Sequence, residues 1–229
     1  PIGNATEKVA AFRLALAQAW ADPQARLFTV FVFLSMLAYS SQDLILEPFA
    51  GAIFGMSPGE TTQLSGVHHS GVLGGMLLVA LAGSRWVKSR MGSVQSWMVG
   101  GCLVSGVAML GLCIAGAMGP PWPLKPNVFL LGVANGSFSI AAIATMMRLA
   151  TQGGEARAGT RMGLWGAAQA LAFGLGGVLG TAFSDLAHAL LGESGWAYAS
   201  VFSMESVMFL VSDAASYISG ANLAVAGAR

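Results

Sequence analysis

The sequence predicts an all-α membrane protein with six transmembrane helices, and three observations lead to this prediction. Of the 229 residues, 55% are hydrophobic and only 9% are charged, whereas a soluble domain carries about 25% charged residues. Apolar runs long enough to span a bilayer, roughly 17 to 25 residues, recur along the chain. Basic residues gather in alternate segments between these runs. The net charge of +1 argues against nucleic-acid binding, which needs a basic face.

The first 26 residues are predicted to be a cytoplasmic or interfacial segment. Within them, residues 4–20 (NATEKVAAFRLALAQAW) read as an amphipathic helix that lies along the inner membrane surface. Apolar side chains recur there at helical spacing: Val9, Phe12, Leu16 and Trp20. Asp22 and Pro23 then end this helix and start the first spanning helix, because proline is favoured at the first helical position.

The predicted bundle occupies residues 27–220, and residues 221–229 are predicted to be a short cytoplasmic tail. The six predicted spans are residues 27–50, 62–84, 95–117, 127–148, 161–183 and 197–219. Small residues four positions apart allow two helices to approach closely. Three such glycine pairs predict close helix packing: Gly71 and Gly75, Gly132 and Gly136, and Gly176 and Gly180.

The basic residues predict the orientation of the chain. With the N-terminus in the cytoplasm, ten of the eleven Lys and Arg residues fall on the inner side, and only Lys125 falls outside. Inner loops of membrane proteins carry the excess of Lys and Arg. A multi-pass protein with both termini in the cytoplasm is therefore expected.

Polar and ionisable side chains form a layer in the outer half of the predicted bundle. Asp43 and Glu47 come late in the outward-running first span, and His68 and His69 come early in the inward-running second span. Asn135 enters the fourth span at a comparable depth. Each must find a partner within the protein, because the hydrocarbon offers no hydrogen bonds. Glu205 of the sixth span lies at a similar depth, and the sequence assigns it no role.

Two interpretations of the carboxylates stay open. Asp43 and Glu47 are four residues apart and share one helix face. Two carboxylates that close cannot both stay ionised in a low dielectric, so one takes up a proton or a cation lies nearby. The functional interpretation is a relay for protons or substrate, or a contact to the polar edge of a pigment or partner. The structural interpretation is a hydrogen bond to His68 or His69, or simple hydration of Glu47 at the outer mouth.

The two histidines also allow two interpretations. Neutral imidazole is the usual protein ligand of a metal centre, and the magnesium of chlorophyll is such a centre. Adjacent helical positions diverge by about 100°, so at most one of His68 and His69 faces a given pigment. The alternative is a histidine paired with Asp43 or Glu47. A separate metal site of a carboxylate and both histidines is not expected, because neighbouring histidines rarely converge on one ion.

Residues 40–76, SSQDLILEPFAGAIFGMSPGETTQLSGVHHSGVLGGM, closely resemble the PucC/LhaA family of light-harvesting complex assembly proteins, a branch of the major facilitator superfamily. The blocks QDLILEPFAG and PGETTQLSG are the specific part. The segments GSRWVKSRMG (83–92) and GGEARAGTRMGLWG (153–166) resemble inner-loop signatures of that superfamily. With GLWGAAQALAFGLGGVLGTAFSDL (163–186), the resemblance extends over essentially the whole chain. It implies the C-terminal six-helix half of a twelve-helix major facilitator fold.

The resemblance implies a non-enzymatic role in the assembly of light-harvesting complexes, in the intracytoplasmic photosynthetic part of a bacterial inner membrane. It implies that the chain binds or delivers either (bacterio)chlorophyll, which would be its cofactor, or antenna polypeptides. It also implies antenna polypeptides or a reaction-centre complex as partners. It also implies that the first, second, fourth and fifth helices line a cavity. The candidate pigment- or partner-binding residues on these helices are Gln42, Asp43, Glu47, His68, His69 and Asn135.

Two other functions remain as alternatives. The chain could be half of a proton-coupled small-molecule transporter, with Asp43 and Glu47 as the relay, or a stable structural subunit of a photosynthetic complex. The sequence holds no nucleotide-binding loop, nucleophile elbow, zinc motif or redox cysteine pair, so an enzyme is not expected. In a six-helix half the cavity face would meet lipid. A second six-helix half or another membrane subunit is therefore expected to cover it.

Overall fold

The protein is described by a computed structural model. The described residues are 13–14, 17–18, 20–83, 93–152, 155–192 and 195–226, and the side chains of Gln24, 151–157 and 213–226 are outside the description. The predicted amphipathic helix at 4–20 and the predicted inner loop at 83–92 fall mostly outside these residues.

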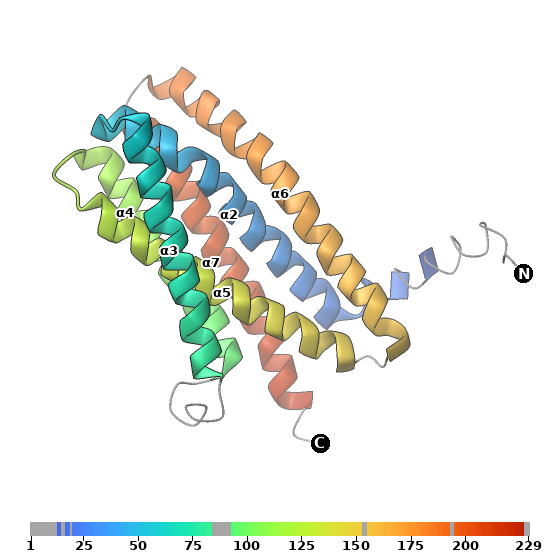
Figure 1. Ribbon diagram of the computed structural model, residues 1–229. Coiled ribbons are helices and arrows are strands. Elements are labelled where there is room, and N and C mark those ends of the chain that lie inside the picture. The colour runs from blue at the N-terminus through green and yellow to red at the C-terminus, as the bar shows by residue number, and fades with distance from the viewer. Residues whose placement is uncertain are drawn as a thin grey trace, which may run out of the picture.

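Six long helices alternate in direction, so that α2 begins and α7 ends at the same end of the bundle (Figure 1). Within the described residues, five of them are long and apolar enough to cross a membrane: α2, α3, α4, α5 and α6. The prediction of an all-α membrane protein is confirmed. Residues 221–226, predicted to be a tail, continue α7 as a helix. The helices are α2 (Pro23–Phe54), α3 (Pro58–Ala82), α4 (Val94–Met118), α5 (Leu124–Gln152), α6 (Glu155–Leu191) and α7 (Gly195–Ala226).

A tight hairpin between α2 and α3 places the predicted site residues opposite one another. Gly55 follows the end of α2 with φ of 66°, a left-handed conformation that glycine adopts without strain. Pro58 then occupies the first turn of α3, and the Glu60 carboxylate accepts a hydrogen bond from the Ser57 backbone N–H at 2.8 Å. The chain therefore reverses within a few residues, and the outer half of α2 faces the start of α3.

The helices pack as neighbouring pairs, with α5 between α3 and α4, and α2 between α6 and α7. The α3–α5 contact brings backbone against backbone. A Cβ atom at Gly75 would overlap the Val133 carbonyl oxygen, and one at Gly132 would overlap the His68 carbonyl oxygen. The predicted close packing at these glycines is confirmed, and it fixes the position of His68 against α5.

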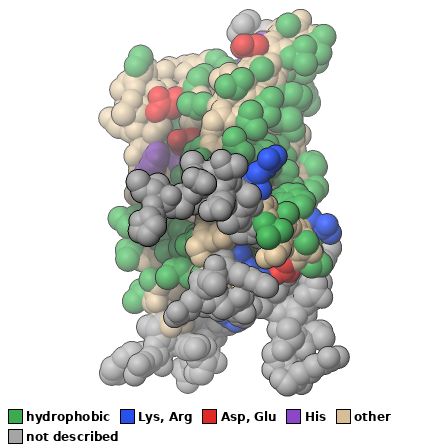
Figure 2. Space-filling model, turned by 90° about the vertical axis from the view of Figure 1, so that its right-hand side faces the viewer, with side chains coloured by type: hydrophobic (Ala, Val, Ile, Leu, Met, Phe, Trp, Pro, Cys, Tyr) green, Lys and Arg blue, Asp and Glu red, His purple; other side chains and the backbone are tan. Residues whose placement is uncertain are grey.

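Aromatic side chains fill the core where the helices meet. Phe28 lies edge-on to Trp165 at a centroid distance of 5.1 Å, and Phe138 meets Phe209 at 5.7 Å. By contrast, α3 and α6 expose large apolar residues such as Leu73, Leu77 and Val178. Figure 2 shows hydrophobic side chains over much of the described surface, with the visible Lys and Arg in its middle and lower parts. That surface is suited to lipid and to other membrane helices.

Candidate functional site

A hydrogen-bonded network of four polar side chains lies inside the bundle and joins α2, α3, α4 and α5. Its members are Gln42, His68, Ser105 and Asn135, and each is 0% exposed. Asn135 lies at the centre: its Nδ2 donates to Gln42 Oε1 at 3.1 Å, and its Oδ1 accepts from Ser105 Oγ at 2.7 Å. Buried polar groups that satisfy one another hold their helices in one relative position. Three predicted candidates, Gln42, His68 and Asn135, are therefore in one cluster.

The hydrogen bonds of this network fix the tautomer of His68. Gln42 Nε2 lies 3.1 Å and Asn135 Nδ2 lies 3.4 Å from His68 Nε2. Amide nitrogens can only donate, so His68 Nε2 is the acceptor. A neutral His68 ring then carries its proton on Nδ1. That atom is buried and has no hydrogen-bond partner among the described residues.

The two carboxylates of α2 each face α3 through a different partner. Asp43 Oδ1 lies 4.0 Å from His68 Nδ1, and the Asp43 side chain is 44% exposed. Glu47 Oε1 accepts a hydrogen bond from Ser65 Oγ at 2.6 Å. Asp43 and Glu47 therefore lie on one face, as the spacing predicts, but each has its own neighbour on α3.

His69 differs from His68 in both exposure and bonding. Its side chain is exposed, and its Nδ1 lies 2.8 Å from the Ser65 carbonyl oxygen one turn earlier in α3. A carbonyl oxygen only accepts, so Nδ1 donates, and in the neutral ring Nε2 keeps a free lone pair. The two rings are inclined by 76°. One histidine is thus bound inside the network, and the other presents a ligand atom to the exterior.

Asp43, His68 and His69 are also the described residues that come closest to a metal-binding set, with ligand atoms within 4.8 Å of one another. Two ligands about 2.1 Å from a tetrahedral ion lie about 3.4 Å apart. The 4.0 Å between Asp43 Oδ1 and His68 Nδ1 is wider than this, and the network leaves the proton on His68 Nδ1. The geometry therefore favours an electrostatic contact between Asp43 and His68 over a three-ligand metal site.

Sequence reasoning missed the buried Ser105 and assigned no role to the buried Glu205. Ser105 completes the network from α4, and its only signal is a hydroxyl in the middle of an apolar span. Glu205 of α7 is also 0% exposed but is not part of the network, and neither of its carboxylate oxygens has a hydrogen-bond partner among the described residues. Its depth was predicted, but its neighbours depend on how α7 packs against α2.

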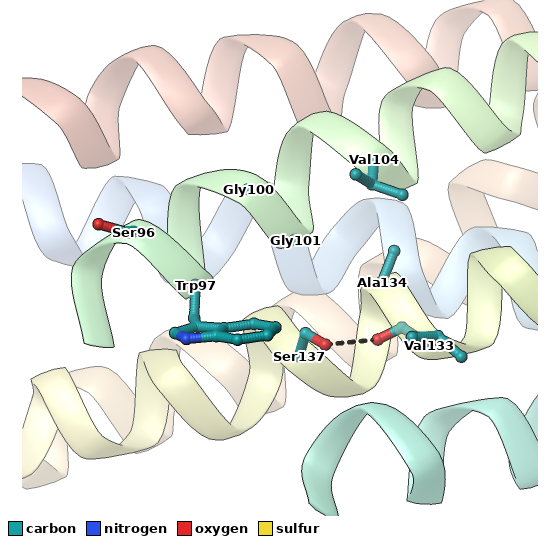
Figure 3. Close-up of a pocket in the computed structure, with 8 residues that line it drawn as sticks. All are labelled: Ser96, Trp97, Gly100, Gly101, Val104, Val133, Ala134 and Ser137. Carbon is teal, nitrogen blue, oxygen red and sulfur yellow. Dashed lines mark hydrogen bonds between the residues drawn. The ribbon is translucent and has the colours of Figure 1, made fainter. Parts of the chain in front are cut away.

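The surface has hollows apart from this network. One of about 370 Å³ lies between α4 and α5, where Trp97 lies beside Ser137 and the Ser137 hydroxyl donates to the Val133 carbonyl at 2.7 Å (Figure 3). Its walls are mostly apolar, and it contains none of the predicted site residues. A second hollow of about 370 Å³, between α2, α6 and α7, has a more polar wall.

Comparisons with known proteins cover most of the chain. A family model described as PUCC protein matches residues 3–217. The "Bacteriochlorophyll synthase 44.5 kDa chain" of Rhodobacter capsulatus is 48% identical over 86% of this chain and 45% of the relative. A "Protein PucC" of Rhodovulum sulfidophilum is 32% identical over 71% of this chain and 34% of the relative. This chain therefore spans less than half the length of either relative. No solved structure matches it significantly.

Proposed function

The chain belongs to the PUCC protein family, and from this premise we propose that it binds (bacterio)chlorophyll and assists the assembly of light-harvesting complexes without catalysis. The printed names of its relatives, a bacteriochlorophyll synthase chain and PucC proteins, support a role in bacterial photosynthesis. The apolar helices support a multi-pass location in the photosynthetic inner membrane. Antenna polypeptides or a reaction-centre complex are the proposed partners, and a second membrane subunit is proposed to cover the cavity face.

The observation that supports pigment binding most directly is the state of His69. A neutral imidazole nitrogen could serve as a protein ligand to the magnesium of a bound chlorin. The Nδ1 donor of His69 is held by the Ser65 carbonyl at 2.8 Å, which orients the imidazole and fixes its tautomer, as in other metal-binding histidines. His69 Nε2 is therefore the proposed magnesium ligand. His68 is excluded from this role, because its ring is buried and its Nε2 accepts from the network.

The surface around His69 has room for a flat ring. Gly66 lies one turn before His69, and no atom lies within 4 Å of a Cβ built there. Leu73 lies one turn after it and is 59% exposed. Residues three and four apart share a helix face, so bare backbone and an apolar side chain flank the imidazole. This strip of α3, from Gly66 to Leu73, is the proposed chlorin platform.

The buried network has a positioning role in this proposal. His68 precedes His69, and the hydrogen bonds of His68 to Gln42 and Asn135 fix the rotation of α3 about its axis. A rotation of α3 that released His68 would also turn His69 away from its present direction. In this proposal His69 is the ligand, and the network of Gln42, His68 and Asn135 orients it.

Replacing His69 with alanine is the direct test. We expect the wild-type chain, purified in mild detergent from a (bacterio)chlorophyll-producing host, to carry about one pigment per chain, and His69→Ala to lose nearly all of it. His188→Ala is the matched control, because His188 Nδ1 also lies 2.8 Å from the carbonyl oxygen of Ser184, four residues earlier. The measurements are the absorption spectrum and mass spectrometry of co-purifying chains. A wild-type chain without pigment, or equal loss in both variants, would contradict pigment ligation by His69.

A second substitution tests the platform while keeping the ligand. Gly66→Leu is expected to weaken pigment binding by about tenfold, equivalent to about 1.4 kcal/mol, because the new side chain occupies the space beside His69. Gly74→Leu is the control, since Gly74 is also open and lies on a different part of α3. Pigment titration into the reconstituted chain measures both. If Gly66→Leu binds pigment with unchanged affinity, the chlorin ring does not lie against Gly66.

A further inference from the structure

Glu205 is a buried carboxyl group that the proposed pigment site does not use. It lies in α7, its side chain is 0% exposed, and both oxygens lack a hydrogen-bond partner among the described residues. The hydroxyl of Ser41 on α2 is also buried, and it too has no hydrogen-bond partner among the described residues. Ser41 is also the polar side chain that acts on Glu205. Two buried polar groups without a hydrogen-bond partner among the described residues therefore lie on the packed helices α2 and α7.

The ion pairs found among the described residues do not include Glu205. Helices α2, α4 and α6 pack against α7, and α5 touches it through Phe138 and Phe209. The described influences on Glu205 are its burial and the Ser41 hydroxyl. A carboxylate buried without a counter-charge is costly, so the neutral acid is the stable form in this position. The titratable side chains described on these helices are Arg26, Tyr39, Asp43 and Glu47 on α2, Cys102 and Cys113 on α4, Lys125 and Arg148 on α5, and Arg161, Asp185 and His188 on α6.

A polar hollow lies between α2, α6 and α7, on the helices that carry this pair and on α6 beside them. Its wall carries Thr181, Ser184, Asp185 and His188 from α6 and Tyr198 from α7. His188 Nδ1 donates to the Ser184 carbonyl, which leaves Nε2 as the proton acceptor of the ring. Pro48, within α2, also lines the hollow, and because proline has no N–H, the Leu44 carbonyl in the same wall loses its helical partner. The wall is therefore rich in groups that accept and pass protons.

The helical register places Ser41 and Glu205 directly inward of this hollow. Ser41 lies one turn, about 5.4 Å of rise, before Ile45 of its wall, and Glu205 lies seven residues after Tyr198 on the same face of α7. On α6, Gly180 precedes Thr181, and a Cβ atom at Gly180 would overlap Ser41 Oγ. All three helices that form the hollow thus continue into the Ser41–Glu205 junction.

We propose that Glu205 and Ser41 form a proton-binding site within the α2–α6–α7 junction, and that protons reach it through the hollow lined by Asp185 and His188. In the loaded state, the Glu205 carboxyl donates its O–H to Ser41 Oγ, and α6 stays packed on Ser41 through Gly180. Loss of the proton leaves a carboxylate to which the Ser41 hydroxyl can donate a single hydrogen bond, so water or a cation must supply the rest of its solvation. Proton release would therefore loosen α6 from α2 and α7.

Infrared spectroscopy of the chain in proteoliposomes at neutral pH tests the protonation. We expect a C=O stretching band of a protonated carboxyl that is absent in Glu205→Gln, which keeps the shape and removes the proton site. Ser41→Ala is the second variant: it should retain the band and shift its frequency, because the hydrogen-bond acceptor is lost. A folded wild-type chain without such a band, or a band unchanged in Glu205→Gln, would overturn the proposal.

The route is tested by the rate at which this band shifts after transfer to D2O. Thr181→Trp places a bulky side chain in the wall of the hollow and is expected to slow the exchange by about tenfold. Val178→Trp is the matched control, because Val178 lies one turn earlier in α6, is 65% exposed and does not line the hollow. Equal exchange rates in the two variants would overturn the route.

Discussion

Gly75→Ala is expected to destabilise the bundle by more than about 3 kcal/mol, although it adds a single methyl group. The new Cβ would overlap the Val133 carbonyl oxygen and crowd the Ser137 backbone nitrogen of α5. These are backbone atoms, so they cannot rotate aside as a side chain can. Relief requires that α3 and α5 move apart along a contact that also includes Gly71 and Gly136. Thermal unfolding of the purified chain in detergent measures the loss.

The neighbouring glycine supplies the matched control. No atom lies within 4 Å of a Cβ at Gly74, so Gly74→Ala should be neutral or should stabilise the chain by roughly 0.5–1 kcal/mol, as expected for glycine replaced within a helix. Both variants replace a glycine of α3 at nearly the same depth. They differ only in the direction of the new methyl group, which points toward α5 at Gly75 and into open space at Gly74. Equal unfolding temperatures would show that α3 does not pack against α5 in this register. Because His68 and His69 lie on α3, that result would also contradict the arrangement of the pigment site.

The sequence predicts the helices and the depth of the polar residues, because both depend on local pattern. Apolar runs predict the spans, and the glycine pair Gly132 and Gly136 predicts a close contact that α3 and α5 do make. The sequence does not reveal which helices meet at these glycines. That choice depends on contacts between residues far apart in the chain, so the pairing of α5 with both α3 and α4 is known only from the structure.

The tertiary structure also decides which of the two histidines is buried in the polar network and which is exposed. The 100° step between adjacent helical residues predicts that His68 and His69 diverge, but it does not say which one is buried. Asn135 of α5 and Gln42 of α2 settle this by surrounding His68 Nε2. Ser105 is not predicted as a site residue because a lone serine in an apolar span commonly forms a hydrogen bond with the backbone of its own helix. Its bond to Asn135 across helices appears only once α4 is placed.

Asn135→Leu is expected to cost about 2–4 kcal/mol, because each buried group left without a partner costs about 1–3 kcal/mol. The substitution leaves Ser105 Oγ without its acceptor and Gln42 Oε1 without its donor, and it removes one donor from His68 Nε2. Asn127→Leu is the control on the same helix, since the Asn127 side chain makes a single described hydrogen bond, to the Ala108 carbonyl at 3.0 Å. Unfolding in detergent should show a clearly larger loss for Asn135→Leu.

A double-mutant cycle that combines Asn135→Leu with Gln42→Leu measures how strongly the two side chains stabilise the protein through each other, apart from their separate packing. When both Asn135 and Gln42 become leucine, neither leaves the other as an unsatisfied polar group. The loss of stability in the double variant should therefore be about 1–2 kcal/mol smaller than the sum of the losses in the two single variants. Independent sites would instead add to within about 0.5 kcal/mol. Additivity would mean that the bond between Asn135 and Gln42 does not hold α5 to α2. The proposed role of this network in directing His69 outward would then lose its physical basis, even if each single substitution reduced stability.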